Sequence, residues 1–93
     1  METITVTITF TDAENGDVNV RILGANTDYG YDASASDVNH DRNFNLAPNV
    51  YSIKVHGVSG GSVKLVVKEG TTELVNASCN PEHIFILKSF AVN

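Results

Sequence analysis

The sequence predicts an all-β fold in which two antiparallel sheets pack face to face as a β-sandwich. Several segments alternate apolar and polar residues with the period of two that gives a strand one buried face. Turn-forming residues separate these segments, and no stretch of ten residues shows helical spacing. A chain of 93 residues can bury one modest core, so we expect a single domain over residues 1–93 with about seven strands.

The first strand is expected over residues 3–11. Its apolar side chains all fall on one face, and threonines occupy the other: Ile4, Val6, Ile8 and Phe10. Asn15-Gly16 is a strong turn signal, and the alternation resumes at Val18, Val20 and Ile22. The sequence therefore predicts a first hairpin between residues 3–11 and 18–22.

A second hairpin is expected over residues 42–57, around a Pro48-Asn49 turn. Its two arms place their apolar side chains on common faces: Phe44 and Leu46 on the first, Tyr51, Ile53 and Val55 on the second. A ribbon this short cannot shield its own apolar face from water. A second sheet must therefore pack against it.

The remaining strands follow a glycine-containing break. Residues 62–68 alternate as a strand, and a turn at residues 69–71 leads into a short returning arm over residues 72–75. We expect the last strand over residues 83–92, with one face formed by Ile84, Ile86, Phe90 and Val92. Phe85 and Leu87 would share the other face. Either the long connection described next covers these two residues, or they form a homo-oligomer or partner interface.

Residues 25–41 show no periodicity and form a connection longer than most hairpin loops, which favours a functional segment. Tyr29 and Tyr31 are two residues apart and project to one side of an extended chain. Aromatic rings beside amide and carboxylate groups suit a carbohydrate or a protein partner. The predicted ligand-binding residues are Tyr29, Tyr31, Asn26, Asp28 and Asp32. The alternative is that the tyrosines only pin the loop to the sandwich.

The same connection contains a pattern that suggests calcium. Asp37, Asn39 and Asp41 copy the first three ligand positions of a helix-loop-helix calcium loop. Arg42 replaces the glycine required at the sixth position, and Pro48 replaces the bidentate glutamate at the twelfth. Calcium is retained as the one candidate cofactor, beside the alternative that these residues are solvated turn residues.

Charge and cysteine content restrict the function. The net charge of -5 repels nucleic acid and anionic membrane surfaces, and no apolar run is long enough for membrane insertion. The single Cys79 excludes an intrachain disulfide. Its four-residue spacing to His83 lacks the further groups that zinc binding or nucleophilic catalysis would need. We therefore expect a protein that is not an enzyme.

Residues 36–55 combine a polar turn, Phe-x-Leu, a proline turn and Tyr-x-Ile-x-Val. This stretch, about a fifth of the chain, resembles transthyretin-like, carboxypeptidase-regulatory-like β-sandwich modules. It departs from them at Asp41-Arg42, where they have a glycine turn, and at Asn49, where their proline precedes a glycine. The resemblance implies a transthyretin-like fold and a non-catalytic accessory role in the cell envelope or in secreted proteins. For the fold class, an immunoglobulin-like Greek key stays open beside the transthyretin-like one.

The sequence thus predicts a non-enzymatic binding or adhesion module that recognises a carbohydrate or protein through residues 25–41. One alternative is a self-associating structural module that buries Phe85 and Leu87 between subunits. The other is an adhesion module stabilised by calcium.

Overall fold

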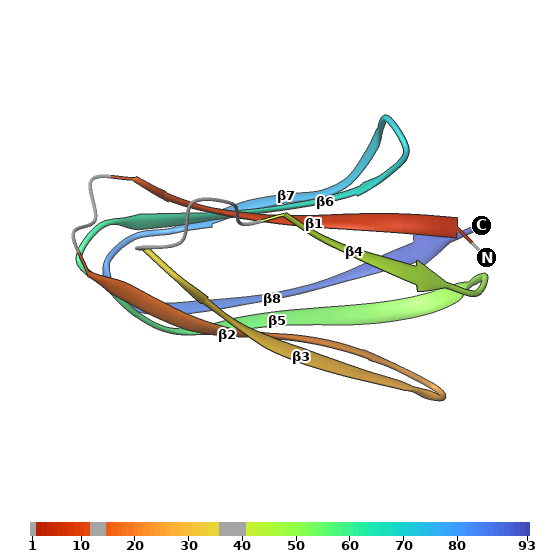
Figure 1. Ribbon diagram of the computed structural model, residues 1–93, viewed down its shortest axis with the longest axis horizontal. Helices are drawn as coiled ribbons and strands as arrows, with labels where there is room; N and C mark the ends of the chain where they lie inside the picture. The colour runs from red at the N-terminus through yellow and green to blue at the C-terminus, as the bar shows by residue number, and fades with distance from the viewer. Residues whose placement is uncertain (1, 12–14, 36–40) are drawn as a thin grey trace.

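A computed structural model describes residues 2–11, 15–35 and 41–93 and confirms the two-sheet antiparallel sandwich (Figure 1). The described residues form eight strands and no helix, so none of them could cross a bilayer as a helix. The strands are β1 (Glu2–Thr11), β2 (Gly16–Gly24), β3 (Thr27–Ser34), β4 (Asp41–Leu46), β5 (Asn49–Ser59), β6 (Ser62–Glu69), β7 (Thr72–Cys79) and β8 (Glu82–Val92).

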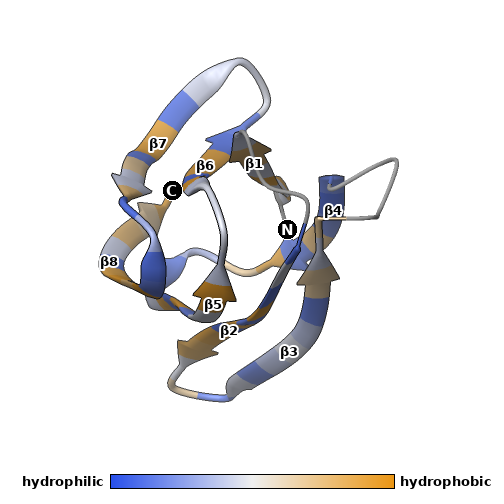
Figure 2. Ribbon diagram, turned by 90° about the vertical axis from the view of Figure 1, so that its left-hand side faces the viewer, coloured by the Kyte–Doolittle hydropathy of each residue, from blue (hydrophilic) through white to orange (hydrophobic). Residues whose placement is uncertain are grey.

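The strands form two sheets of four. Sheet A has the order β4-β1-β6-β7, sheet B has the order β3-β2-β5-β8, and all neighbours are antiparallel. β3 lies beside β4 on one flank of the sandwich and β7 beside β8 on the other (Figure 2). The first four strands therefore build one lateral half of the molecule, and the last four strands build the other half.

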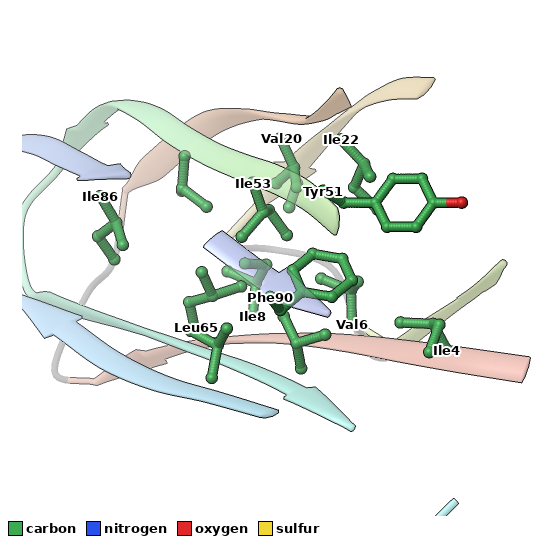
Figure 3. Packing of buried hydrophobic residues seen from close by; sticks show 14 of the residues in the cluster. Ile4, Val6, Ile8, Val20, Ile22, Tyr51, Ile53, Leu65, Ile86 and Phe90 are labelled. Atoms are coloured by element: carbon green, nitrogen blue, oxygen red, sulfur yellow. The ribbon is translucent and has the colours of Figure 1, made fainter. Parts of the chain in front are cut away.

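The core lies between the sheets and consists of the inward faces that the alternation predicted. Figure 3 shows these side chains meeting between the layers, with Tyr51 stacked on Phe90 at a ring-centroid distance of 5.7 Å. The buried apolar residues are Ile4, Val6, Ile8, Val18, Val20, Ile22, Ala33, Leu46, Tyr51, Ile53, Val55, Val63, Leu65, Val67, Val75, Ile84, Ile86, Phe90 and Val92. Their burial from water is the main source of the stability of the fold.

Two of the predicted hairpins are wrong, because the paired segments belong to different sheets. β1 lies in sheet A and β2 in sheet B, and the chain likewise crosses from β4 in sheet A to β5 in sheet B around Pro48. The Tyr51 hydroxyl donates a hydrogen bond of 2.6 Å to the Ala47 carbonyl and so ties this crossing to the core. Phe44 and Leu46 still face inward, because the apolar face of a strand points into the core whichever of the two sheets contains the strand.

The predicted hairpin at residues 62–75 is confirmed as β6 and β7, with Gly70 at the turn in the left-handed region at φ 61°. β7 extends further than predicted, to Cys79, and carries an irregularity opposite Val67 and Lys68. The C-terminal strand is also confirmed. β8 pairs with β5 along its whole length, from Glu82 to Val92.

The irregular connection predicted over residues 25–41 is wrong for Thr27–Ser34, which form β3 and raise the strand number to eight. β3 returns from β2 through a turn at Ala25 and Asn26 and pairs with it along its length. Its aspartates and its glycine disfavour strands, and its outer face is exposed at the edge of the sheet. Backbone pairing with β2 forms the strand despite this composition.

Gly57 marks a place where the backbone of β5 approaches β2 closely. It has a φ of 156°, and a Cβ there would lie 2.7 Å from the Val18 Cα and would overlap the Asp17 carbonyl oxygen.

We expect Gly57→Ala to lower the free energy of unfolding by at least about 2 kcal/mol, because the backbone of β2 or β5 must shift to make room for the Cβ. Gly30→Ala is the matched control, since its Cβ would meet Arg21 Cγ and the Val20 carbonyl oxygen at 3.7 Å each, which are ordinary contact distances. Denaturant unfolding of both variants checks this, and equal effects would contradict it.

Candidate functional site

The predicted ligand-binding residues of the 25–41 segment do not form one surface. In β3, Tyr29 and Tyr31 project to one side, as predicted, and contact the β4 edge of the other sheet. Asp28 and Asp32 have the opposite parity and lie on the outer face of sheet B, while Asn26 is in the turn that precedes the strand. Recognition of a carbohydrate or a protein by these five residues stays a prediction, and they do not lie together on one face of the molecule that could support it.

The two tyrosines close the flank between β3 and β4. Their rings lie 5.4 Å and 6.0 Å from the ring of Phe44, measured between centroids, and the Arg42 guanidinium lies 4.6 Å from the centre of the Tyr31 ring. Tyr31 is half-buried by these contacts, whereas 45% of Tyr29 remains exposed. The arrangement matches the alternative in which aromatic side chains attach this segment to the sandwich.

The two aspartates of β3 are engaged on the outer face of sheet B. The Arg21 guanidinium donates to both oxygens of Asp28 at 2.6 Å and 2.8 Å, in an ion pair with partly exposed partners. Asn19 donates a hydrogen bond of 3.0 Å to Asp32. Both carboxylates stay exposed, and the Arg21 guanidinium offsets the charge of Asp28.

The calcium prediction rests on residues that the structure covers only in part. Asp37 and Asn39 lie outside the described residues, and Asp41 begins β4. The Thr7 hydroxyl donates a hydrogen bond of 2.7 Å to Asp41 Oδ1. Within residues 2–11, 15–35 and 41–93, no three His, Cys, Asp or Glu side chains gather where they could hold a metal ion. Calcium binding stays a prediction.

Phe85 and Leu87 are on the outer face of β8, where 60% and 57% of their areas are exposed. Phe85 lies directly across from His56 on β5, and Val58, which is 56% exposed, is its diagonal neighbour on the same face. We call Val58, Phe85 and Leu87 the outer patch. The predicted cover by the 25–41 segment is not provided by β3, which lies at the opposite edge of sheet B.

Two hollows adjoin the outer patch. A groove of about 490 Å³ separates the β7 and β8 edges, and Asn76, Ala77 and Ser78 face Phe85–Lys88 across it. A wider hollow of about 690 Å³ at the end of sheet B adjoins Val58 and contains Asp17, Glu82 and His83. Apolar side chains next to amide, hydroxyl and charged groups are typical of protein-binding surfaces. Sequence patterns missed both hollows, because their walls come from strands that are distant in sequence.

Cys79 is half-buried, and its thiol lies 3.5 Å from the Asn80 carbonyl oxygen and 3.7 Å from that of His83. The hydroxyl of Ser59 accepts a hydrogen bond of 3.1 Å from the Gly61 backbone N–H. Both groups therefore have structural partners in the backbone.

The outer face of sheet A differs from that of sheet B in being a regular polar array. Thr3, Thr5 and Thr7 of β1 donate hydrogen bonds of 3.3, 2.8 and 2.7 Å to the side chains directly opposite on β4. The acceptors are Asn45, Asn43 and Asp41. The sequence predicted that threonines share this face of β1, but it did not predict their partners, which depend on the pairing of β4 with β1.

Comparison of the chain with family models, curated proteins and solved structures gives no match. The resemblance to transthyretin-like modules therefore stays a prediction, and the case for function rests on the geometry of this chain.

Burial raises the pKa of Tyr31 from 10.0 to about 12, although Arg42 acts to lower it. The Tyr31 hydroxyl is buried and has no hydrogen-bond partner among the described residues. We expect Tyr31→Phe to leave the free energy of unfolding at pH 7 unchanged or to raise it by up to about 1 kcal/mol.

The same shift predicts a dependence on pH. The raised pKa favours the neutral phenol in the folded state, so its contribution to stability is present below pH 10 and is lost between pH 10 and 12. Denaturant unfolding at several pH values should show a steeper alkaline loss for the wild type than for Tyr31→Phe. Parallel curves would contradict the assignment.

Proposed function

We propose that this domain is a non-enzymatic structural module that associates with further copies of itself through β8 and the outer patch. The observation that carries the proposal is the exposure of Phe85 and Leu87, which are 60% and 57% accessible at adjacent outward positions of one strand. Large neighbouring apolar side chains on a protein surface favour burial against a partner.

The distribution of exposed apolar residues supports this surface. Among the described residues, six large apolar side chains are exposed, and five of them lie on the outer face of sheet B: Leu23, Val50, Val58, Phe85 and Leu87. The outer face of sheet A contains hydrogen-bonded threonines and amides instead. Burial against a partner is therefore more favourable for the outer face of sheet B than for that of sheet A.

β8 also offers backbone hydrogen-bonding groups. It is an edge strand of eleven residues, and within the described chain no further strand of sheet B follows it on its outer side. The corresponding edges of sheet A are less suited to pairing, because β4 has only six residues and β7 carries an irregularity. A long, regular edge beside an apolar patch is a template for strand addition.

Removal of the apolar area tests the proposal. We expect the double variant Phe85→Thr, Leu87→Thr to weaken self-association at least about tenfold, because threonine keeps the strand preference but removes most of the buried apolar area. Sedimentation equilibrium over a wide range of concentrations measures the association constant.

Val66→Thr is the control, because Val66 points outward from β6 on the opposite sheet. It should associate like the wild type. A wild-type protein that stays monomeric at every concentration, or a double variant that associates as strongly as wild type, would remove the proposed function.

A further inference from the structure

We infer that two copies of the domain pack the outer faces of their B sheets against each other in a closed two-fold dimer. This inference rests on the self-association proposed above and decides between the two contacts that β8 offers, its free edge and its outer face. Side chains stand perpendicular to a sheet, so a strand added at the free edge would lie beside Phe85 and Leu87 and leave their outer sides in water. A second layer packed on the face buries them.

The free edge of β8 contains a charge that opposes strand addition. Lys88 has the same parity as the buried Ile86 and Phe90, yet it is exposed, because β8 is the last strand of sheet B within the described chain. A strand added there would extend the core past Lys88 and enclose its ammonium group, and an inward-pointing charge on an edge strand protects that edge from pairing. In contrast, the outward positions of β8 include no lysine, arginine or carboxylate and are occupied by His83, Phe85, Leu87, Ser89 and Ala91.

The register of sheet B aligns its outer side chains in rows that cross all four strands. The row that contains Phe85 has a carboxylate but no lysine or arginine, and we call it the acidic row: Asp32, Asn19, His56 and Phe85. The next row contains Leu87 and has two cations but no carboxylate, and we call it the basic row: Gly30, Arg21, Lys54 and Leu87. Asp28 of a further row offsets the charge of Arg21, and Lys54 keeps the basic row positive.

The charges of these two rows select the direction in which two faces stack. With each row on its own counterpart, Arg21 and Lys54 of one molecule would lie over the same two cations of the other, and the like charges would repel each other. A two-fold axis parallel to the rows and midway between them instead places the acidic row of each copy on the basic row of the other. Lys54 then lies over His56 of the other copy, whose ring can accept a hydrogen bond.

The other opposed side chains also suit each other in this arrangement. Phe85 of each copy packs on Leu87 of the other, so both exposed apolar side chains of β8 become buried. Asp32 lies over Gly30, whose missing side chain leaves space for the carboxylate beside the Arg21 guanidinium. The centre of the contact is therefore apolar on β8 and of opposite charge on β2 and β3.

The neighbouring rows extend the contact across the face. Four of its five exposed apolar residues lie within the four rows that the two copies share, with Leu23 and Val58 in the outer two rows. Asp17 of one copy and Asp28 of the other lie in opposed rows but on neighbouring strands, and Arg21 already binds Asp28 at 2.6 Å. Four strands and four rows cover roughly 500 Å² per copy, so two copies bury roughly 1,000 Å², at the lower end of the range for specific interfaces. We therefore expect a weak dimer that depends on protein concentration.

Reversal of one charge on β3 tests the geometry. Asp32 lies on the edge strand of sheet B that is farthest from β8, so edge pairing through β8 does not involve it. Face packing does involve it, because Asp32→Lys gives the acidic row a positive charge against the basic row, twice in a two-fold dimer. We expect the dissociation constant of the dimer to rise at least about fivefold. Sedimentation equilibrium measures it, and the wild type should form a dimer and nothing larger.

Glu73→Lys on β7 is the matched control. Both carboxylates are exposed and accept a hydrogen bond from an asparagine, at 3.0 Å from Asn19 to Asp32 and at 2.8 Å from Asn76 to Glu73. Both substitutions change the net charge by the same amount, but Glu73 belongs to sheet A. Glu73→Lys should associate like the wild type, and equal effects of the two variants would overturn the face packing.

The outcomes separate this inference from the proposed function. A dimer that Asp32→Lys leaves unchanged, while Phe85→Thr with Leu87→Thr weakens it, overturns the face packing and keeps self-association through β8. Growth beyond a dimer overturns the closed two-fold contact. A wild type that stays monomeric removes both proposals.

Hydrogen exchange on the unaltered protein decides the same question, also if Asp32→Lys should fail to fold. Alternate backbone N–H groups of β8 point away from β5, toward the free edge. Face packing leaves these groups in exchange with water in the dimer, whereas edge pairing protects them. Protection of these N–H groups that appears as the protein concentration is raised would overturn the inference.

Discussion

Burial of the inward faces of the two sheets is the interaction on which the rest of the structure depends. Neither four-stranded sheet can shield its own apolar face, and the interior combines β-branched residues with the stacked pair Tyr51 and Phe90. Each connection that crosses from one sheet to the other holds the two inward faces together. The connection around Pro48 shows how, because the Tyr51 hydroxyl bonds to the Ala47 carbonyl and fixes the crossing at the end of the core.

Because the inward faces of both sheets form the core, the two outward faces are separate surfaces, and their side chains differ in chemistry. On sheet A, threonines alternate with the apolar residues of β1 and bond to side chains of β4. On sheet B, the corresponding positions of β8 include Phe85 and Leu87. The division of the chain into two lateral halves adds a second asymmetry, because strands β1 to β4 contain five acidic residues and two arginines, whereas strands β5 to β8 contain three glutamates and four lysines. The two outer faces and the two lateral halves both follow from the order of the strands in the sheets.

Sequence patterns were sufficient for the fold class and for most inward faces, because the direction in which a side chain points follows from period-two alternation alone. They were insufficient for strand partners. Phe44 and Tyr51 point into the same core whether their strands pair in one sheet or face each other across the interior, so alternation cannot distinguish a hairpin from a crossing. β3 was missed because Asp28, Gly30 and Asp32 disfavour strands, and only pairing with β2 forms it.

The candidate site shows the same limit. Phe85 and Leu87 could be identified from the sequence, because they have the parity opposite to the buried residues of β8. Tyr29 and Tyr31 were placed on one side correctly, but grouping them with Asp28 and Asp32 required an irregular loop, and a strand sends these pairs to opposite faces. The groove between β7 and β8 depends on which strands form the edges, which local patterns do not contain.

The threonine array on sheet A has a consequence for the thickness of any assembly. Its hydroxyls donate to Asn43, Asn45 and Asp41 and keep lone pairs in contact with water. Stacking a second layer on this face would remove that water, which is unfavourable for every lone pair that gains no new donor. An assembly formed through β8 would therefore keep the outer face of sheet A hydrated and add no second layer there.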